Sequence, residues 1–190
     1  MSRLFVDVDT QGDFINPKGA LYVPGAEKIR VILAKITKMA KDDKIEIIKT
    51  MDEHDGSEPE MAVNGGPFPL HCMACTEGQA AIIETGTKKA KIFTKRCYNV
   101  FDDKLGNPEI DAWLKKSKFT EAYVYGLCGN ICVEAMVMGL IARGIETFVF
   151  ENAVVWMNLE EGIFCKGIDN KELSIARMRK AGAHFAKAGL

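Results

Sequence analysis

The chain has 190 residues, of which 47% are hydrophobic and 27% are charged. A chain of this length lies within the range of one globular domain, about 100 to 200 residues, and can bury enough surface to fold without disulfides. Its net charge of −1 creates no field that would attract nucleic acid or an anionic membrane. We therefore expect a single domain over residues 1–190, with neither nucleic acid nor a membrane as partner.

The N-terminus and the cysteines indicate the compartment. Asp7 follows the first six residues at once, which is unlike a signal peptide, and no apolar run approaches the ~18 residues of a membrane-spanning helix. Without an export signal, cysteines are expected as thiols. The chain has six of them: Cys72, Cys75, Cys97, Cys128, Cys132 and Cys165. These features predict a soluble, cytoplasmic protein in which one cysteine thiol is a candidate for a chemical role.

Short apolar runs alternate with stretches of helical periodicity along the chain. Residues 4–8 form a run with two β-branched valines, and from Ala26 apolar residues recur at intervals of three and four, as on a helix with one buried face. Further strands are predicted at 45–50, 91–94, 122–127, 147–150 and 184–185, and further helices at 108–116, 130–143 and 171–180. This alternation predicts an α/β fold, an open parallel sheet with helices on both faces.

Reactive side chains follow the predicted strands. Asp9 follows the first strand, Asp52 the second and Lys95 the third, while Cys132 lies at the start of the helix after the fourth. In an open parallel sheet, ligands bind beyond the carboxyl ends of the strands. The long segment 52–78 lacks periodicity, and a loop of this length is usually functional. The sequence therefore places its chemistry at one edge of the sheet.

Asp9, Lys95 and Cys132 are candidates for a catalytic set. A cysteine at a helix start is favoured as a thiolate by the macrodipole, although it can also be a small apolar residue packed there. Asp9, after a buried strand, is costly unless paired or used, or else caps a helix or organises a loop. Lys95 would hold both partners ionised, or it is a solvated surface lysine. Together they offer a nucleophile, a general acid/base and electrostatic support.

Asp52, His54 and His71 are candidate metal ligands. Asp52 and His54 are two residues apart, so in extended backbone their side chains point the same way, and His71 lies in the loop beyond. The chain has 3 histidines, and two of them fall in this segment. Such donors suit Zn²⁺, Fe²⁺ or Mn²⁺ with positions open for water or substrate. Loop histidines with unrelated roles are the alternative.

Two rival motifs have weaker support. Cys72 and Cys75 form a C-x-x-C pair, but a zinc finger needs a second pair, and the spacing of Cys128 and Cys132 straddles a strand-to-helix turn. The loop after the first strand lacks the G-x-G-x-x-G of a dinucleotide site. Neither a structural zinc finger nor a dinucleotide site is therefore expected.

The assembled motifs resemble the isochorismatase-like cysteine hydrolases, and among them the nicotinamidases. The resemblance spans nearly the whole chain. The matching segments are VDTQGDF at 8–14 against V-D-x-Q-x-D-F, GALYVPG at 19–25 against G-A-L-x-V-P-G, DEH at 52–54 against D-x-H, FPLHC at 68–72 against W-P-x-H-C, GLCGNICV at 126–133 against G-x-x-T-D-x-C-V, and AGA at 181–183 against A-G-A. Phe68 stands in place of the usual tryptophan, and Gly129-Asn130 in place of Thr-Asp.

The resemblance implies a role for each candidate. It implies that Cys132 is the nucleophile, Asp9 the proton shuttle and Lys95 their partner. It also implies one divalent metal ion, Zn²⁺ with Fe²⁺ or Mn²⁺ as alternatives, held by Asp52, His54 and His71, with Glu60 a candidate for a further ligand.

The pocket residues are implied in the same way. Backbone N–H groups of Cys128 and Cys132 would receive the oxyanion, with a cis peptide bond at Leu127-Cys128. Phe14 and Phe68 would flank the substrate ring.

The activity implied is hydrolysis of nicotinamide to nicotinate and ammonia through a cysteine thioester. One alternative is the same chemistry on a ureido or carbamoyl compound. Another is a non-catalytic metal-binding protein, against which the joint presence of Asp9, Lys95 and Cys132 argues. We expect a small-molecule amide as partner, and an exposed apolar helix face makes a homo-oligomer the expected assembly.

Overall fold

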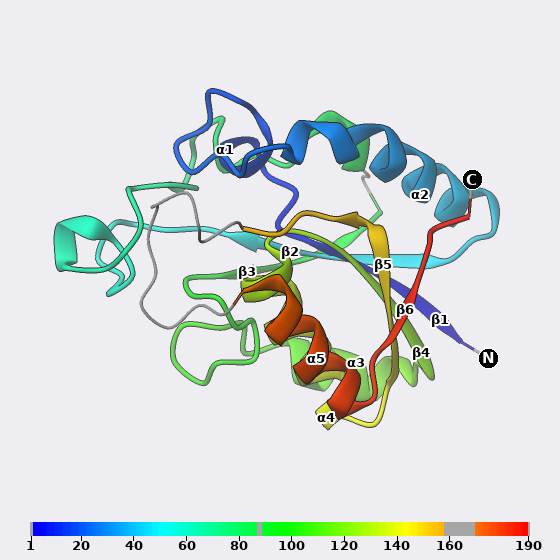
Figure 1. Cartoon of the computed structure of the whole chain (residues 1–190). Coiled ribbons are helices and arrows are strands. Elements are labelled where there is room, and N and C mark those ends of the chain that lie inside the picture. Colours follow the sequence, from blue (N-terminus) through cyan, green and yellow to red (C-terminus); the bar gives the residue numbers. More distant parts are fainter. Residues whose placement is uncertain (1, 87–88, 158–169, 190) are drawn as a thin grey trace.

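A six-stranded parallel sheet forms the centre of the molecule (Figure 1). The computed structural model describes residues 2–86, 89–157 and 170–189. The strand order is β3-β2-β1-β4-β5-β6, and every neighbouring pair is parallel. The predicted open parallel sheet is confirmed.

All six strands lie where the sequence predicts them, with shifted ends. They are β1 (Arg3–Val8), β2 (Glu46–Asp52), β3 (Lys91–Lys95), β4 (Glu121–Gly126), β5 (Glu146–Val154) and β6 (His184–Ala186). The largest shift is in β5, predicted to end at Phe150. Glu151 and Asn152 interrupt its apolar run, but Ala153 and Val154 are buried again and the strand continues through them.

Helices cover both faces of the sheet, as predicted. The α-helices are α1 (Gly12–Ile15), α2 (Arg30–Asp42), α3 (Ile110–Ser117), α4 (Glu134–Ala142) and α5 (Lys171–Ala181). Figure 1 shows α1 and α2 on one face and α3, α4 and α5 on the other. The longest described helix, α2, has 13 residues, short of the ~20 that a bilayer span needs, so no described helix is a candidate to cross a membrane.

Shorter helical turns explain where the helix predictions differ from the structure. Three are 3₁₀ turns, η1 (Ala26–Ile29), η2 (Ala62–Asn64) and η3 (Ile83–Thr85), and one is a π-helical turn, η4 (Gly129–Val133). The helix predicted from Ala26 therefore begins as η1, and the helix predicted from Asn130 divides into η4 and α4. The four residues of α1 are too few to show a period, so that helix was not predicted.

Strands that are buried on both faces of a sheet have sequences that are almost continuously apolar. In β1, Leu4, Val6 and Val8 join the core beneath α4, whereas Phe5 joins the core beneath α2 with Leu33. Successive side chains of a strand point to opposite faces, which produces this division.

A buried ion pair interrupts the apolar face beneath α2. Asp7 is 1% and Lys49 3% exposed, and Lys49 Nζ lies 3.1 Å from Asp7 Oδ2. Lys49 Nζ also donates a hydrogen bond to Thr85 Oγ1 at 3.0 Å, which ties η3 to the sheet. Burial raises the pKa of Asp7 although Lys49 attracts its charge. The pair is therefore fully desolvated, and removing one partner leaves the other without compensation.

We expect Lys49→Met to lower the free energy of unfolding by about 3 kcal/mol, because Asp7 is then buried without its cation. The double variant Asp7→Val/Lys49→Met should regain most of this loss, since two apolar side chains need no pairing. Urea unfolding followed by circular dichroism measures both. A double variant no more stable than Lys49→Met would contradict this account of the pair.

Candidate active site

The reactive side chains gather where the strand order reverses. β1 lies between β2 and β4, and Val8 at its end is paired with Thr50 on one side and Gly126 on the other. The chains that leave β1 and β4 then run to opposite faces, which opens a crevice at the carboxyl edge of a parallel sheet. Asp9 enters the crevice from β1, and Cys132 enters it from the chain after β4.

Asp9 turns sharply out of β1. Its backbone is in the left-handed region, with φ of 52°, which aspartate tolerates better than most residues. Its N–H donates to the carbonyl oxygen of Thr50 at 3.1 Å, and the Thr50 hydroxyl donates to Asp9 Oδ1 at 2.7 Å. These contacts leave Oδ2 directed at the other side chains of the crevice.

The chain after β4 approaches β1 closely. Gly126 has φ of 118°, and a Cβ there would lie 2.0 Å from the carbonyl oxygen of Val8, so only glycine fits. The Leu127-Cys128 peptide bond that follows is cis, as the resemblance implies. The chain then enters η4, in which Cys132 is buried against the sheet.

Lys95 joins the three strands at their carboxyl ends. It is the last residue of β3 and pairs in register with Asp52, the last residue of β2. Its Nζ lies 2.8 Å from Asp9 Oδ2 and 3.6 Å from Cys132 Sγ, and it forms a further ion pair with Asp52 Oδ1. The three side chains singled out in the sequence therefore meet at one buried point, and Asp52 meets them there.

Burial raises the pKa of Cys132, and the carboxylates of Asp9 and Asp52 add to the effect while Lys95 opposes it. This direction is opposite to the one that the helix start alone favours, because burial and two carboxylates act against one ammonium. Burial also raises the pKa of Asp9, against the attraction of Lys95, which makes that carboxylate a better proton acceptor than an ordinary aspartate.

Asp52, His54 and His71 converge beside this cluster. One donor atom from each lies within 4.8 Å of the others, and His54 Nε2 and His71 Nε2 are 3.7 and 4.0 Å from Asp52 Oδ2. Both ring nitrogens of His54 are buried, yet neither has a hydrogen-bond partner among the described residues. Such an orphaned imidazole is unfavourable, and a divalent cation would satisfy it. The residues therefore fit a metal ion.

The ionised carboxylate of Asp52, the neutral ring of His71 and the negative field at His54 also suit a cation. Burial opposes ionisation of Asp52, but Lys95 and His54 lower its pKa to about 2. Burial lowers the pKa of His71, which keeps that imidazole neutral. Burial opposes protonation of His54 as well, yet Asp52 and Glu60 raise its pKa, which shows the negative field around this ring. Metal ions bind an ionised carboxylate and neutral imidazoles.

Glu60 lies at the same place. Its Oε1 is 3.5 Å from His54 Nε2, and it lines the same cavity as Asp52 and His71. Burial and the nearby Asp52 raise its pKa to about 7. The candidate for a further ligand thus faces the histidines.

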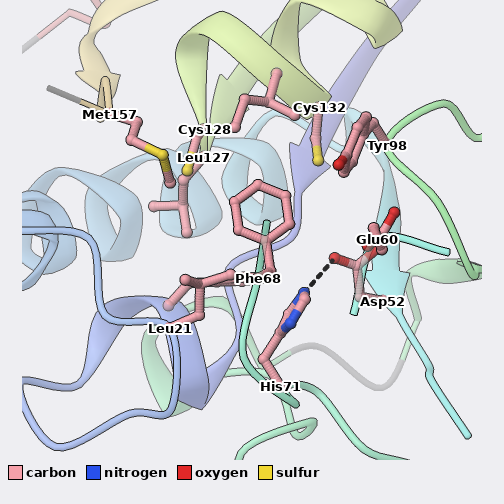
Figure 2. A pocket seen from close by; sticks show the side chains of 12 residues that line it. Leu21, Asp52, Glu60, Phe68, His71, Tyr98, Leu127, Cys128, Cys132 and Met157 are labelled. Carbon is pink, nitrogen blue, oxygen red and sulfur yellow. Dashed lines mark ion pairs between the residues drawn. The ribbon is translucent and has the colours of Figure 1, made fainter. Parts of the chain in front are cut away.

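Figure 2 shows the cavity above these groups. Its empty space, counted together with the open mouth, is about 340 Å³. Figure 2 shows His71 facing Asp52 at one end of the cavity, with Glu60 beside Asp52 and with Cys132 and Tyr98 above them. The lining residues are Phe14, Leu21, Asp52, Glu60, Phe68, His71, Tyr98, Leu127, Cys128, Ile131, Cys132 and Met157.

Several of the lining residues were not predicted from the sequence. Tyr98 follows β3 and Met157 follows β5, so their places beyond carboxyl ends were a signal that could have identified them. Leu21, in the loop after α1, offers no such signal. Met157 is held by Asn130, whose Nδ2 donates to the Met157 carbonyl oxygen at 3.2 Å and whose Oδ1 accepts from its N–H at 3.0 Å.

Cys72 and Cys75, the C-x-x-C pair, differ in burial. Cys72 is buried, and its N–H donates to Asp13 Oδ2 at 2.7 Å, whereas Cys75 is exposed. Within the described part of the chain, neither belongs to a group of converging metal donors. The described cysteines are free thiols, as expected, and Cys165 lies outside the described residues.

Comparison with known proteins defines the class. Residues 3–188 match the family described as Isochorismatase domain, so the chain belongs to this family. The resemblance found in the sequence motifs is confirmed.

Similar proteins include enzymes that act on small amides. The nicotinamidase of Saccharomyces cerevisiae is 25% identical over 183 residues, which cover 77% of this chain and 85% of that protein. The pyrazinamidase of Pyrococcus horikoshii, solved in complex with zinc, has a TM-score of 0.84 at 22% identity and covers 99% of this chain and 100% of its own. PnC1 from L. infantum, solved in complex with nicotinate, has a TM-score of 0.83 at 18% identity, covering 98% and 92%. The solved structures show a shared fold.

We expect Lys95→Met to slow alkylation of Cys132 by iodoacetamide at neutral pH, with the rate recovering as the pH rises. Lys95 lowers the pKa of the thiol, so deleting its charge raises that pKa further. Mass spectrometry of the labelled peptide identifies Cys132 among the other cysteines.

Lys91→Met is the matched control, because Lys91 lies on the same strand but contacts the exposed Glu109. Its alkylation profile should equal that of the wild type. An unchanged profile for Lys95→Met, in a variant whose circular dichroism is that of the wild type, would contradict the electrostatic role of Lys95.

Proposed function

We propose that this protein is a metal-dependent amide hydrolase that converts nicotinamide and water into nicotinate and ammonia. The observation that carries the proposal is the meeting of Cys132, Asp9 and Lys95 beside the converging donors of Asp52, His54 and His71. A metal-binding protein without catalysis needs only the second group. A thiol beside a proton acceptor and a cation is the arrangement of nucleophilic catalysis.

The first half-reaction begins with the neutral thiol of Cys132. Asp9, whose pKa is raised by burial, accepts the thiol proton, and Lys95 stabilises the thiolate from 3.6 Å. Sγ attacks the carboxamide carbon, and the oxygen becomes an oxyanion that the backbone N–H groups of Cys128 and Cys132 receive. Such a donor is commonly worth about 3 to 4 kcal/mol in the transition state.

The second half-reaction returns the enzyme to its starting state. Asp9 gives its proton to the leaving nitrogen, ammonia departs, and a thioester joins the acyl group to Cys132. Asp9 then takes a proton from water, the hydroxide attacks the thioester carbon, and the thiol leaves with that proton. One carboxyl thus serves as base and acid in turn, as its burial between Thr50 and Lys95 permits.

The aromatic lining of the cavity suits a planar aromatic substrate. The rings of Phe14 and Phe68 lie 5.5 and 5.9 Å from the His71 ring, measured between centroids, so aromatic walls meet the polar end. A metal held by Asp52, His54 and His71, with Glu60 beside them, would supply a Lewis-acid centre for the ring nitrogen of a pyridine carboxamide. We propose Zn²⁺, with Fe²⁺ or Mn²⁺ as alternatives, from this oxygen and nitrogen donor set.

We expect the wild type to release ammonia from nicotinamide and Cys132→Ala to lower turnover by a factor of about 10³ or more, because the variant lacks the thiol that lies beside Asp9 and Lys95. Circular dichroism should show an intact fold. Cys75→Ala is the control, since Cys75 is an exposed thiol outside the cavity, and it should keep wild-type turnover.

A panel of amides separates this proposal from its alternatives. Ammonia release from ureido or carbamoyl compounds but not from nicotinamide would retain the chemistry and change the substrate. Substantial turnover by a folded Cys132→Ala variant would remove Cys132 from the mechanism. No release from any amide by metal-loaded protein would favour the non-catalytic metal-binding protein.

We expect His71→Ala to weaken zinc binding by more than about 100-fold, because it removes one of the metal ligands. Loss of a residue that only supports a ligand typically weakens binding by ~10- to 100-fold. Competition with a chromophoric chelator measures the affinity. His184→Ala is the matched control, since His184 lies exposed on β6, and its affinity should equal that of the wild type. A wild type that binds no zinc, iron or manganese would contradict the metal site.

A further inference from the structure

Glu58 is a buried acid that the proposed mechanism does not use. It is 1% exposed and lies in the loop after β2, four residues beyond His54. A buried carboxylate is unfavourable unless its oxygens are paired. The contacts of Glu58 therefore indicate the role of its negative charge.

Three donors hold this carboxylate in one orientation. Arg96 Nε donates to Glu58 Oε1 at 2.7 Å, and the N–H of Asp55 donates to the same oxygen at 3.1 Å. The N–H of Gly56 donates to Oε2 at 3.0 Å. Arg96 directly follows Lys95 at the end of β3. The loop after β2 is thereby attached to the strand that carries Lys95.

The held carboxylate faces one ring nitrogen of His54. Glu58 Oε1 lies 3.5 Å from His54 Nδ1, while Nε2 of the same ring lies 3.7 Å from Asp52 Oδ2. The separation from Nδ1 is slightly beyond that of a hydrogen bond, and Nδ1 has no other partner among the described residues. Glu58 is thus the acceptor placed for an N–H at this position.

His71 shows the same arrangement with a different acceptor. Its Nδ1 lies 2.8 Å from the carbonyl oxygen of Pro69, and its Nε2 lies 4.0 Å from Asp52 Oδ2. In both rings Nδ1 faces an oxygen outside the group of Asp52, His54 and His71, and Nε2 faces Asp52, although His54 Nε2 also lies 3.5 Å from Glu60 Oε1. An acceptor that holds the proton on one imidazole nitrogen leaves the lone pair of the other free for a metal.

We propose that Glu58 is the positioning residue of His54, and that Arg96 holds it in that role. Its carboxylate accepts the Nδ1 proton and keeps the Nε2 lone pair directed at the space shared with Asp52 and His71. This inference rests on the metal site of the proposed function. It adds a residue that orients one metal ligand, and so strengthens metal binding, without contacting the metal itself.

The tautomer of His54 tests the proposal without metal or substrate. Nitrogen-15 NMR of metal-free protein, at a pH where the imidazoles are neutral, resolves the ring nitrogens of a chain with 3 histidines. We expect His54 to carry its proton on Nδ1 in the wild type, and Glu58→Gln to shift population to the Nε2 form. A wild-type His54 protonated on Nε2 would overturn the proposal whether or not the variant folds.

Zinc affinity provides the second measurement. We expect Glu58→Gln to weaken zinc binding about 10- to 100-fold. Asp55→Asn is the matched control, because Asp55 pairs with the same Arg96 but is exposed, and its affinity should stay within about twofold of the wild type. Equal losses in both variants would assign the effect to the loop as a whole and overturn the proposal.

The two measurements separate this inference from the function on which it rests. A wild type that binds no metal but shows the Nδ1 tautomer would contradict the metal site and retain the Glu58 contact. A wild type that binds zinc tightly, with affinity and tautomer unchanged in Glu58→Gln, would retain the metal site and overturn the role of Glu58.

Discussion

The buried ammonium of Lys95 is the interaction on which the rest of the site depends. Asp9 and Asp52 each place a carboxylate oxygen within 4.8 Å of the other and of Cys132 Sγ, and all three residues are buried. Two buried carboxylates at this distance repel strongly and resist ionisation. Lys95 contacts both, and they in turn raise its pKa despite its burial. The same ammonium joins the proposed proton acceptor, nucleophile and metal ligand.

The parallel sheet supplies this contact by bringing strand ends to one edge. The side of the cavity formed by β1, β2 and β3 carries the charges, whereas the chain after β4 and β5 forms an apolar wall. That wall contains one departure from the family pattern, Gly129-Asn130, and both residues contact the chain after β5. Gly129 leaves room for the Trp156 ring, which a Cβ would approach to 2.5 Å, and the Asn130 amide both donates to and accepts from Met157. A carboxylate in place of Asn130 could only accept.

Elements with a strong local pattern were predictable. Apolar runs identified the central strands β1, β2 and β4, which are buried on both faces. The prediction ended β5 early because Glu151 and Asn152 are polar, although the strand continues to Val154 through its contacts with neighbouring strands. Helix α1 was missed because its four residues show no period.

The sequence by itself determined which residues reach the carboxyl edge of the sheet, because Asp9, Asp52 and Lys95 end or follow strands whose parallel direction follows from the alternating pattern. Only the tertiary structure decided their charge states and partners. Burial beside two carboxylates raises the pKa of Cys132, whereas the helix start alone would lower it. The contact between His54 and Glu58 depends on Arg96, which arrives from another strand. Local spacing does not encode burial and long-range contacts, since both depend on how distant segments pack together.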